Sequence, residues 1–273
     1  MKDAGNIKDA ADAVKGIVEA IPIYQDAFQP AAKEIGIGLQ TVAKTLHIVL
    51  APIAGLVWGY DRVKEFVQTR VAEKLRNVPI ENIATPEPHV VVPALIALSY
   101  TAHQENLREL YANLLATSLD SRTCELAHPA FVDIIKNLSP DEARIMRLAS
   151  TKAMFPVIEV RNVHTTTNHF STIFHNFSSV GKEAGCDHPA MTPAYLNNLC
   201  RLGLLDLPGQ GSFGMPTLTA PNTYEPLEND EEIIAQKKQV ESVEGHQIQF
   251  RRGMVLVTSF GRQFCQACVI EKE

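Results

Sequence analysis

Apolar residues recur at helical spacing through the first half of the chain. Between Asn6 and Ile21 they occupy one face of a helix, and between Ile35 and Val67 they form a longer stripe whose steps alternate between four and three residues. This spacing places the stripe on one side of a helix. Pro52 lies within the stripe, and because proline removes a backbone donor and clashes with the preceding turn, we expect a kink there.

Further amphipathic stretches follow the stripe. They are separated by the proline-containing segments 77–79 and 86–88 and by Pro129. Such helices bury one side against their neighbours, so we predict an amino-terminal helical bundle over residues 1–138. The expected apolar face of its last long helix comprises Leu107, Leu110, Tyr111, Leu114, Leu115 and Leu119.

The stretch from Lys44 to Tyr60 is the most apolar part of the chain. A transmembrane helix needs about 20 mostly apolar residues. The segment 35–60 is long enough, but it contains Gln40, Lys44 and His47, and its apolar residues keep to one stripe. We favour a helix buried in the bundle. A helix that inserts into a membrane after a conformational change is a second interpretation, and a permanent span is a third.

Small residues accompany the stripe on the other faces of this helix. Ala51, Gly55 and Gly59 are spaced four residues apart. That spacing lets a second helix backbone approach closely, in water or in lipid. Together with Pro52, these residues form the candidate helix-association or membrane face.

A different pattern begins at Ser139. Ser139, Pro140 and Glu142 predict a helix start, with serine as the N-cap, proline at the first position and glutamate completing a capping box. The β-branched stretch 155–163 favours a strand. An amphipathic helix is expected over Phe170–Gly181.

A second helix-start pattern follows at Thr192, which we expect to act as the N-cap of a helix that stops at Gly203. A short strand, "LLDL", leads into a long acidic loop at about residues 209–245. The final stretch, 246–271, favours a strand and a last helix. Residues 139–273 are therefore predicted to form a second, α+β module.

The order of these elements resembles the winged helix-turn-helix family, and the stretches "LNNLCRLGLL" and "LVTSFGRQF" carry the resemblance. The predicted fold class is mainly α with a small β component, a helical bundle followed by a winged-helix-like module. In family members that read DNA, the third helix presents basic or amide side chains to the major groove. The corresponding contact candidates here are Asn197, Asn198 and Arg201 on that helix, and the predicted wing adds Arg251 and Arg252.

Charge argues against a nucleic-acid partner for this module. From Ser139 onward the sequence has 12 Lys and Arg against 15 Asp and Glu, and the whole chain has a net charge of -6. Nucleic-acid binding depends mostly on neutralising phosphates with basic side chains. We therefore expect a protein-contact or structural module, with DNA binding as the weaker alternative.

The amino terminus and the cysteines indicate a cytoplasmic protein. Asp3, Asp9 and Asp12 interrupt the region where a signal peptide would need an apolar run. The five cysteines are odd in number and scattered, which is typical of thiols kept reduced and packed as small hydrophobic groups.

The residues with metal or redox chemistry have simpler interpretations. Cys265 and Cys268 form a C-x-x-C in the last predicted helix, where packing in the core is favoured over redox or metal chemistry. His164, His169 and His175 match no familiar metal spacing and are expected to be solvated or capping residues. No phosphate-binding glycine loop or nucleophile elbow occurs. We therefore expect no catalytic, cofactor-binding or metal site, with an enzyme as the alternative.

Four stretches resemble the bacterial abortive infection alpha family. They are "IPIYQDAFQPAAKEIGIGLQTVAKTL", "LAPIAGLVWGYDRVKEFVQTRVAEKL", "YANLLATSLD" and "AHPAFVDIIKNLSPDEARIM". The resemblance implies a cytoplasmic bacterial or prophage-borne protein linked to phage defence. It brings no established catalytic residues to this chain.

Two hypotheses fit that setting. In the first, the chain is a non-enzymatic effector whose carboxy-terminal module senses or holds a partner and whose helix 35–60 acts on the inner membrane after release. In the second, it is a soluble regulatory protein that forms homo-oligomers through its helical half and contacts a phage component or DNA through its second module.

Overall fold

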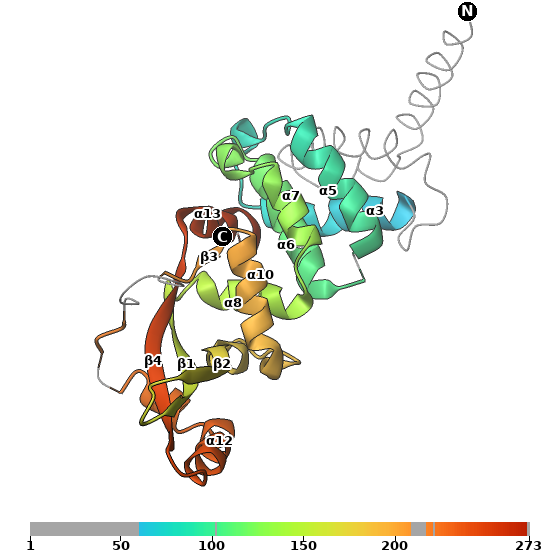
Figure 1. Cartoon of the computed structure of the whole chain (residues 1–273). Helices are drawn as coiled ribbons and strands as arrows, with labels where there is room; N and C mark the ends of the chain where they lie inside the picture. The colour runs from blue at the N-terminus through green and yellow to red at the C-terminus, as the bar shows by residue number, and fades with distance from the viewer. Residues whose placement is uncertain (1–59, 102, 209–216, 221, 272–273) are drawn as a thin grey trace, which may run out of the picture. The chain divides into compact units, whose positions relative to one another are not determined.

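The computed structural model describes residues 60–101, 103–208, 217–220 and 222–271 (Figure 1). The chain divides into two compact units. Unit 1 takes the described residues up to His103, Tyr111–Val132 and Glu271, and unit 2 takes Gln104–Leu110 and Asp133–Ile270. The boundary that the sequence predicts between residues 138 and 139 stays a prediction.

Unit 1 begins with a continuous helical run made of α3 (Tyr60–Phe66), the π-helix η1 (Val67–Val71) and α4 (Ala72–Leu75). Val63 and Val67, which end the predicted apolar stripe, are both buried. The inward face of the described part of this stripe is therefore confirmed. The part of the stripe before Tyr60 lies outside the described residues.

The next helices are α5 (Pro88–Thr101) and α6 (Glu105–Ser118), joined to the first run through the short 3-10 helix η2 (Ile80–Asn82). All six residues of the predicted apolar face of the 104–119 segment are buried, with exposed fractions of 5% or less. After η3 (Cys124–Leu126), α7 (Ala130–Lys136) starts directly behind Pro129, as the sequence predicts.

Unit 2 contains the helix α8 (Pro140–Ala149), whose start was predicted from the sequence. The Ser139 hydroxyl accepts a hydrogen bond from the Glu142 backbone N–H at 3.2 Å, and the Glu142 carboxylate accepts one from the Ser139 N–H at 2.6 Å. These two bonds satisfy backbone donors that a helix start otherwise leaves without partners. The predicted capping box is confirmed.

The remaining elements of unit 2 alternate between strands and short helices. The strands are β1 (Met154–His164), β2 (Phe170–Phe177), β3 (Leu205–Asp206) and β4 (His246–Val257). The helices are α9 (Val180–Glu183), η4 (Pro189–Met191), α10 (Thr192–Arg201), α11 (Glu225–Glu228), α12 (Glu231–Glu241), α13 (Ser259–Phe264) and the π-helix η5 (Cys265–Val269).

The four strands form one antiparallel sheet in the order β2-β1-β4-β3. β1 and β4 pair along their whole length, from Met154 with Leu256 to His164 with His246. The pairing of β1 with β2 shifts register twice, on either side of Val160. At the other edge, β3 contributes only two residues.

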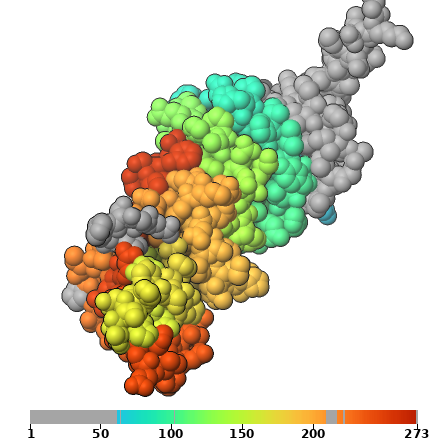
Figure 2. All heavy atoms as spheres, viewed as in Figure 1, coloured from blue at the N-terminus to red at the C-terminus, as the bar shows by residue number. Residues whose placement is uncertain are grey.

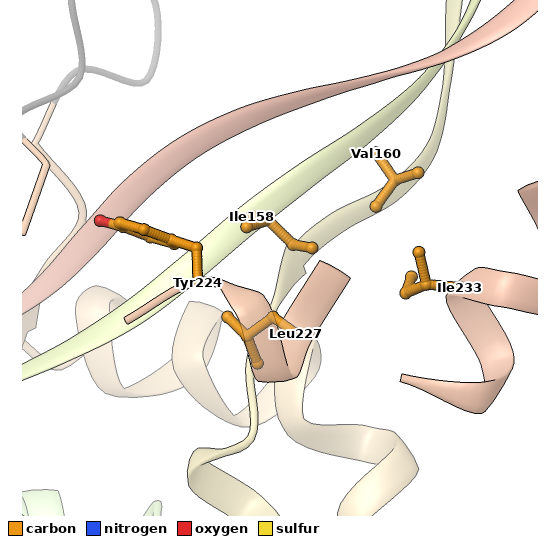
Figure 3. Packing of buried hydrophobic residues seen from close by; sticks show 5 residues of the cluster. All are labelled: Ile158, Val160, Tyr224, Leu227 and Ile233. Carbon is orange, nitrogen blue, oxygen red and sulfur yellow. The ribbon is translucent and has the colours of Figure 1, made fainter. Parts of the chain in front are cut away.

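One face of the sheet carries a hydrophobic cluster. Ile158 and Val160 of β1 pack with Tyr224, Leu227 and Ile233 from the α11–α12 segment (Figure 3). Apolar side chains from β2 and β4 complete the cluster, namely Phe174, Phe177, Ile248 and Phe250, with Leu218 beside them.

Three sequence predictions for unit 2 were wrong. The helix expected over Phe170–Gly181 is strand β2 up to Phe177, because Phe174 and Phe177 pair with β1 and join the cluster on one sheet face. Thr192 does not cap α10; its hydroxyl donates to the Pro189 carbonyl at 2.6 Å instead. The loop expected at about 209–245 contains helices α11 and α12, whose apolar residues cover the sheet.

The predicted fold class is confirmed at its coarser level. The described residues are mainly helical, and their strands form one small curled sheet.

Candidate functional site

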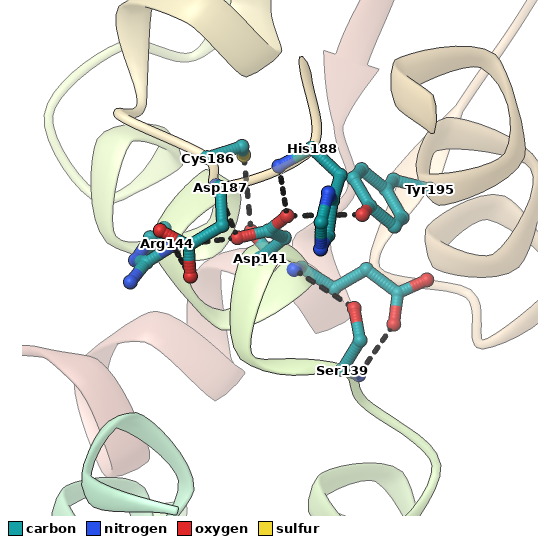
Figure 4. Close-up of polar contacts among 8 residues, drawn as sticks. Ser139, Asp141, Arg144, Cys186, Asp187, His188 and Tyr195 are labelled. Carbon is teal, nitrogen blue, oxygen red and sulfur yellow. Dashed lines mark hydrogen bonds and ion pairs between the residues drawn. The ribbon is translucent and has the colours of Figure 1, made fainter. Parts of the chain in front are cut away.

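A densely hydrogen-bonded polar cluster surrounds Asp141 at the start of α8. We call Asp141, Arg144, Asp187, His188 and Tyr195 the Asp141 cluster (Figure 4). The Asp141 carboxylate accepts hydrogen bonds from the backbone N–H groups of Asp187 at 2.9 Å and His188 at 3.0 Å. It also accepts one from the Tyr195 hydroxyl at 2.9 Å and one from Arg144 at 2.6 Å.

The residues of this cluster come from three segments of the chain. Asp141 and Arg144 are one helical turn apart on α8, Tyr195 lies on α10, and Asp187 and His188 belong to the loop between α9 and η4. Arg144 also pairs with the Asp187 carboxylate at 2.7 Å. The cluster therefore joins α8, this loop and α10 with directional, charge-assisted bonds.

The electrostatics of the cluster follow from burial and hydrogen bonding. Burial alone would raise the pKa of Asp141, but the bonds from Asp187, His188, Tyr195 and Arg144 stabilise the charged form, and the pKa lies below its usual value. Burial, with a further contribution from the bond to Asp141, raises the pKa of Tyr195 to about 12. The carboxylate is thus charged at neutral pH and the phenol is protonated.

The Asp141 cluster has a structural role in unit 2. Both carboxylate oxygens of Asp141 already accept two bonds each, and the side chain is only 5% exposed. An acid–base group needs an approachable oxygen and a pKa near the working pH. Asp141 has the opposite properties, so its chemistry in this fold is that of a fixed anion that positions α10.

The predicted contact residues on α10 engage other residues of the chain. The Asn198 amide donates to the Asn137 carbonyl at 3.0 Å and to the Glu142 carboxylate at 2.8 Å. Its amide oxygen accepts two bonds from Arg201, at 2.9 and 2.7 Å. Asn197 accepts a bond from the Asn176 amide at 3.1 Å. The structure therefore brings Asn198 and Arg201 together, at the capping box of α8.

The two predicted wing arginines lie on β4 and pair with different carboxylates. Arg252 makes a bidentate pair with Glu228 of α11, at 2.6 and 2.9 Å. Arg251 lies 3.4 Å from Glu159, which also accepts bonds from Arg161 and Thr172. Burial alone would raise the pKa of Glu159, but these bonds lower it below the usual value.

The cysteines of the last helix lie in the core. Cys265 and Cys268 are 3% and 0% exposed in η5, and the Cys265 thiol donates to the Met146 carbonyl. Burial raises the pKa of Cys265 to about 12 and that of Cys268 well above its usual value. Because the thiolate is the reactive form, these side chains act as packing groups, as the sequence predicts.

The three predicted histidines do not gather into one site. His164 lies at the end of β1, where its Nδ1 accepts bonds from the backbone N–H groups of Thr166 and Thr167, and its ring packs edge-on against His246. His169 and His175 are exposed. Among the described residues, no group of three or more His, Cys, Asp or Glu side chains is arranged to hold a metal ion.

The candidate helix-association face, Ala51, Pro52, Gly55 and Gly59, lies outside the described residues. Within the described ranges, none of the helices has both the length and the apolar character that a membrane span requires.

Sequence reasoning missed the Asp141 cluster. The only local signal was an aspartate in the first turn of α8, which helix starts generally favour. Its partners Asp187 and Tyr195 lie 46 and 54 residues further along the chain, and no spacing rule connects positions so far apart.

The fold and this site define a class of protein. The described residues form a mainly α protein with a small antiparallel sheet, in which charged side chains join elements of the fold. The chain belongs to the abortive infection alpha family, whose family model matches residues 59–268. Family membership indicates a role in abortive-infection defence against phages.

None of the curated proteins matches the chain. One solved structure, an uncharacterized protein from the hydrocarbon-degrading marine bacterium Alcanivorax borkumensis SK2, shares 19% sequence identity at a TM-score of 0.35. The match covers 52% of this chain and 93% of that one.

Proposed function

We propose that this chain is a non-enzymatic phage-defence protein in which unit 2 holds a protein partner, such as a phage component, and the amino-terminal helices carry out the response. The proposal combines the family with the chemistry of unit 2. The proposal includes that unit 2 is a winged-helix-like module and that this module contacts the partner.

One observation carries the choice of a protein partner over DNA. The amides and cations that would have to read DNA are committed to neighbouring groups: Asn198 and Arg201 bind each other, and Arg252 binds Glu228. A DNA contact would have to break these bonds in a module whose sequence is net acidic. Such a module gains little of the phosphate neutralisation on which DNA affinity depends.

A binding experiment tests this choice. We expect the full chain to leave the fluorescence anisotropy of a labelled DNA duplex unchanged at ~10 μM protein in low salt, where even non-specific DNA-binding proteins associate. Glu228→Gln frees Arg252, and Glu225→Gln removes the same charge from an exposed neighbour as a control. Salt-sensitive DNA binding by the wild type would contradict the protein-contact proposal. Binding by Glu228→Gln alone would show that the Arg252–Glu228 pair is what prevents a DNA contact.

The proposed response is an action on the membrane, after the partner binds, by the helix that the sequence predicts over residues 35–60. The support is the sequence: a continuous apolar stripe together with Ala51, Gly55 and Gly59 suits both a bundle core and a lipid environment. The alternative is a soluble homo-oligomeric regulator that acts through protein or DNA contacts.

Two measurements separate these possibilities. Fractionation of bacteria during phage challenge should show the protein moving from the soluble to the membrane fraction, and purified protein should release dye from liposomes. Gly55→Leu should abolish the leakage because it blocks close helix approach. No leakage, together with a stable soluble oligomer, would favour the regulator. If the chain leaves plaque formation and survival of infected cells unchanged, the defence proposal itself fails.

A further inference from the structure

Helix α12 lies on the apolar face of the sheet in unit 2 and is attached to it by few side chains. Of its eleven residues, only Ile233 and Val240 are buried. Ile233 packs in the cluster with Ile158 and Val160 (Figure 3). We call the apolar side chains that β1 and β4 contribute to this cluster, Ile158, Val160, Ile248 and Phe250, the α12 seat.

The amino-terminal end of α12 is held by charge. Asp230 caps the helix by accepting a hydrogen bond from the Glu232 N–H at 3.1 Å, and its carboxylate pairs with Lys182 at 2.6 Å. The Lys182 side chain is 63% exposed. An exposed ion pair contributes little stability, but it selects the orientation and charge of whatever binds there. The seat therefore has an apolar floor and a cation at one end.

The two neighbouring helices differ in how firmly they are anchored. α11 is preceded by Tyr224, whose buried hydroxyl donates to the Gly253 carbonyl at 2.9 Å and accepts a bond from the Leu218 N–H. The polar contacts of α12 are exposed by comparison. A helix that buries two side chains and must order eleven residues is among the first parts of a fold to open.

The surface of the module is consistent with access to this region. The β1–β2 hairpin and the α12–β4 segment form adjoining parts of the surface in Figure 2, coloured yellow and orange-red. The Thr165 N–H of the hairpin donates to the Gly245 carbonyl at 2.8 Å, which ties the connection after α12 to the hairpin. The backbone pairing of β1 with β4 does not include residues of α12.

We infer that the α12 seat is a docking site for an amphipathic helix of a protein partner, one with an acidic amino-terminal turn, and that α12 occupies this site as an internal ligand until the partner replaces it. The argument is one of complementarity: Asp230 pairs with Lys182 and Ile233 packs on the seat, and a partner helix needs the same two features. The inference rests on the proposed protein-contact role of unit 2 and names the class of partner.

The consequence is competition. The internal helix is present at a high effective concentration because it is tethered beside its site. A partner helix binds only to molecules in which α12 has left, so its apparent affinity is reduced by the fraction of time that the seat is open. Weakening the attachment of α12 must therefore tighten the binding of an external helix.

The test uses a fluorescent synthetic peptide with the sequence of residues 228–244 as the external helix. It is titrated against the full-length wild type, Ile233→Ala and Ile234→Ala. Ile233 is 1% exposed and its neighbour Ile234 is 38% exposed. The two variants therefore make the same chemical change, once at the buried contact with the sheet and once at the exposed surface of α12. We expect the peptide to bind Ile233→Ala at least about tenfold more tightly than the other two proteins.

Hydrogen exchange then shows where the peptide binds. The amides of residues 231–241 in Ile233→Ala should exchange faster when the unlabelled peptide is added, and the alanine distinguishes this helix from the peptide by mass. A peptide carrying Asp230→Asn should bind more weakly, and one carrying Glu241→Gln should bind like the parent. Circular dichroism checks that the variants are folded; should Ile233→Ala unfold, Asp230→Ala in the chain loosens α12 by removing both its cap and its ion pair.

Three results would overturn the inference: equal peptide affinity for all three proteins, no binding to a folded loosened variant, or binding that leaves the α12 amides protected. These outcomes are separate from those that test the proposed function. A chain that protects cells from phage but does not exchange α12 retains its defence role without this docking site. A chain that exchanges α12 but gives cells no protection has this docking site without the proposed defence role.

Discussion

Replacing Asp141 by asparagine should destabilise unit 2 because the new side chain has almost the same shape but lacks the charge. Each Asp141 oxygen accepts two hydrogen bonds, from donors that include two backbone N–H groups and Arg144. An amide keeps one acceptor oxygen and turns an N–H₂ group toward the remaining donors. Since charge-assisted bonds are lost and buried donors are left unsatisfied, we expect a loss of about 2–4 kcal/mol in the free energy of unfolding.

The assay is urea unfolding followed by circular dichroism at neutral pH, with the free energy extrapolated to water. Asp133→Asn is the matched control, because the Asp133 side chain is 75% exposed and pairs with Lys136 on the same helix. Such a surface pair contributes little, so the control should lose less than about 0.5 kcal/mol. Equal losses in the two variants would refute the structural role assigned to the Asp141 cluster.

The pH dependence provides a second test of the same reasoning. The pKa of Asp141 is lowered in the fold, so its contribution to stability is complete above the ordinary aspartate pKa of about 3.9 and disappears as the pH falls through the folded value. The difference between wild type and Asp141→Asn should therefore shrink in acid. A difference that stays constant below about pH 4 would show that the charge is not the cause.

Two further outcomes follow from the packing of unit 2. Gly181→Ala should lower the urea midpoint clearly more than Gly185→Ala. A Cβ on Gly181 would lie 2.0 Å from the Thr192 hydroxyl, whereas Gly185 has open space and only an unfavourable positive φ of 66°. Equal midpoints would contradict this packing. A maleimide reagent at about pH 8 should label the exposed Cys124 and leave the buried Cys268, whose pKa is raised, unmodified until urea is added; rapid labelling of Cys268 in the native protein would refute its placement in the core.

Local signals in the sequence were sufficient where neighbouring residues decide the structure. The Ser139–Glu142 capping box spans four positions, and the leucine face of α6 repeats at helical spacing, so both could be predicted and both are present. The strand β2 was mistaken for a helix because its phenylalanines at 170, 174 and 177 have helical spacing. Its partner strand β1 supplies the backbone bonds and determines the outcome.

The candidate site depended on contacts that a single sequence does not reveal. Asn198 and Arg201 suit a DNA-reading helix by residue type, yet in the fold they bind each other and the start of α8. Glu228 becomes the partner of Arg252 only because α11 folds back over the sheet. The sequence therefore indicated which side chains were of a type that could contact a partner. The residue that each of them binds in the fold was set by distant segments.

The irregular β2 edge of the sheet has a consequence for how copies of this protein can associate. A regular outer strand is an open template on which further chains polymerise. Here the β1–β2 pairing changes register twice within a few residues, on either side of Val160. The β2 edge of the described sheet therefore offers no straight ladder, and fibre growth by addition of strands to β2 is disfavoured even at high concentration.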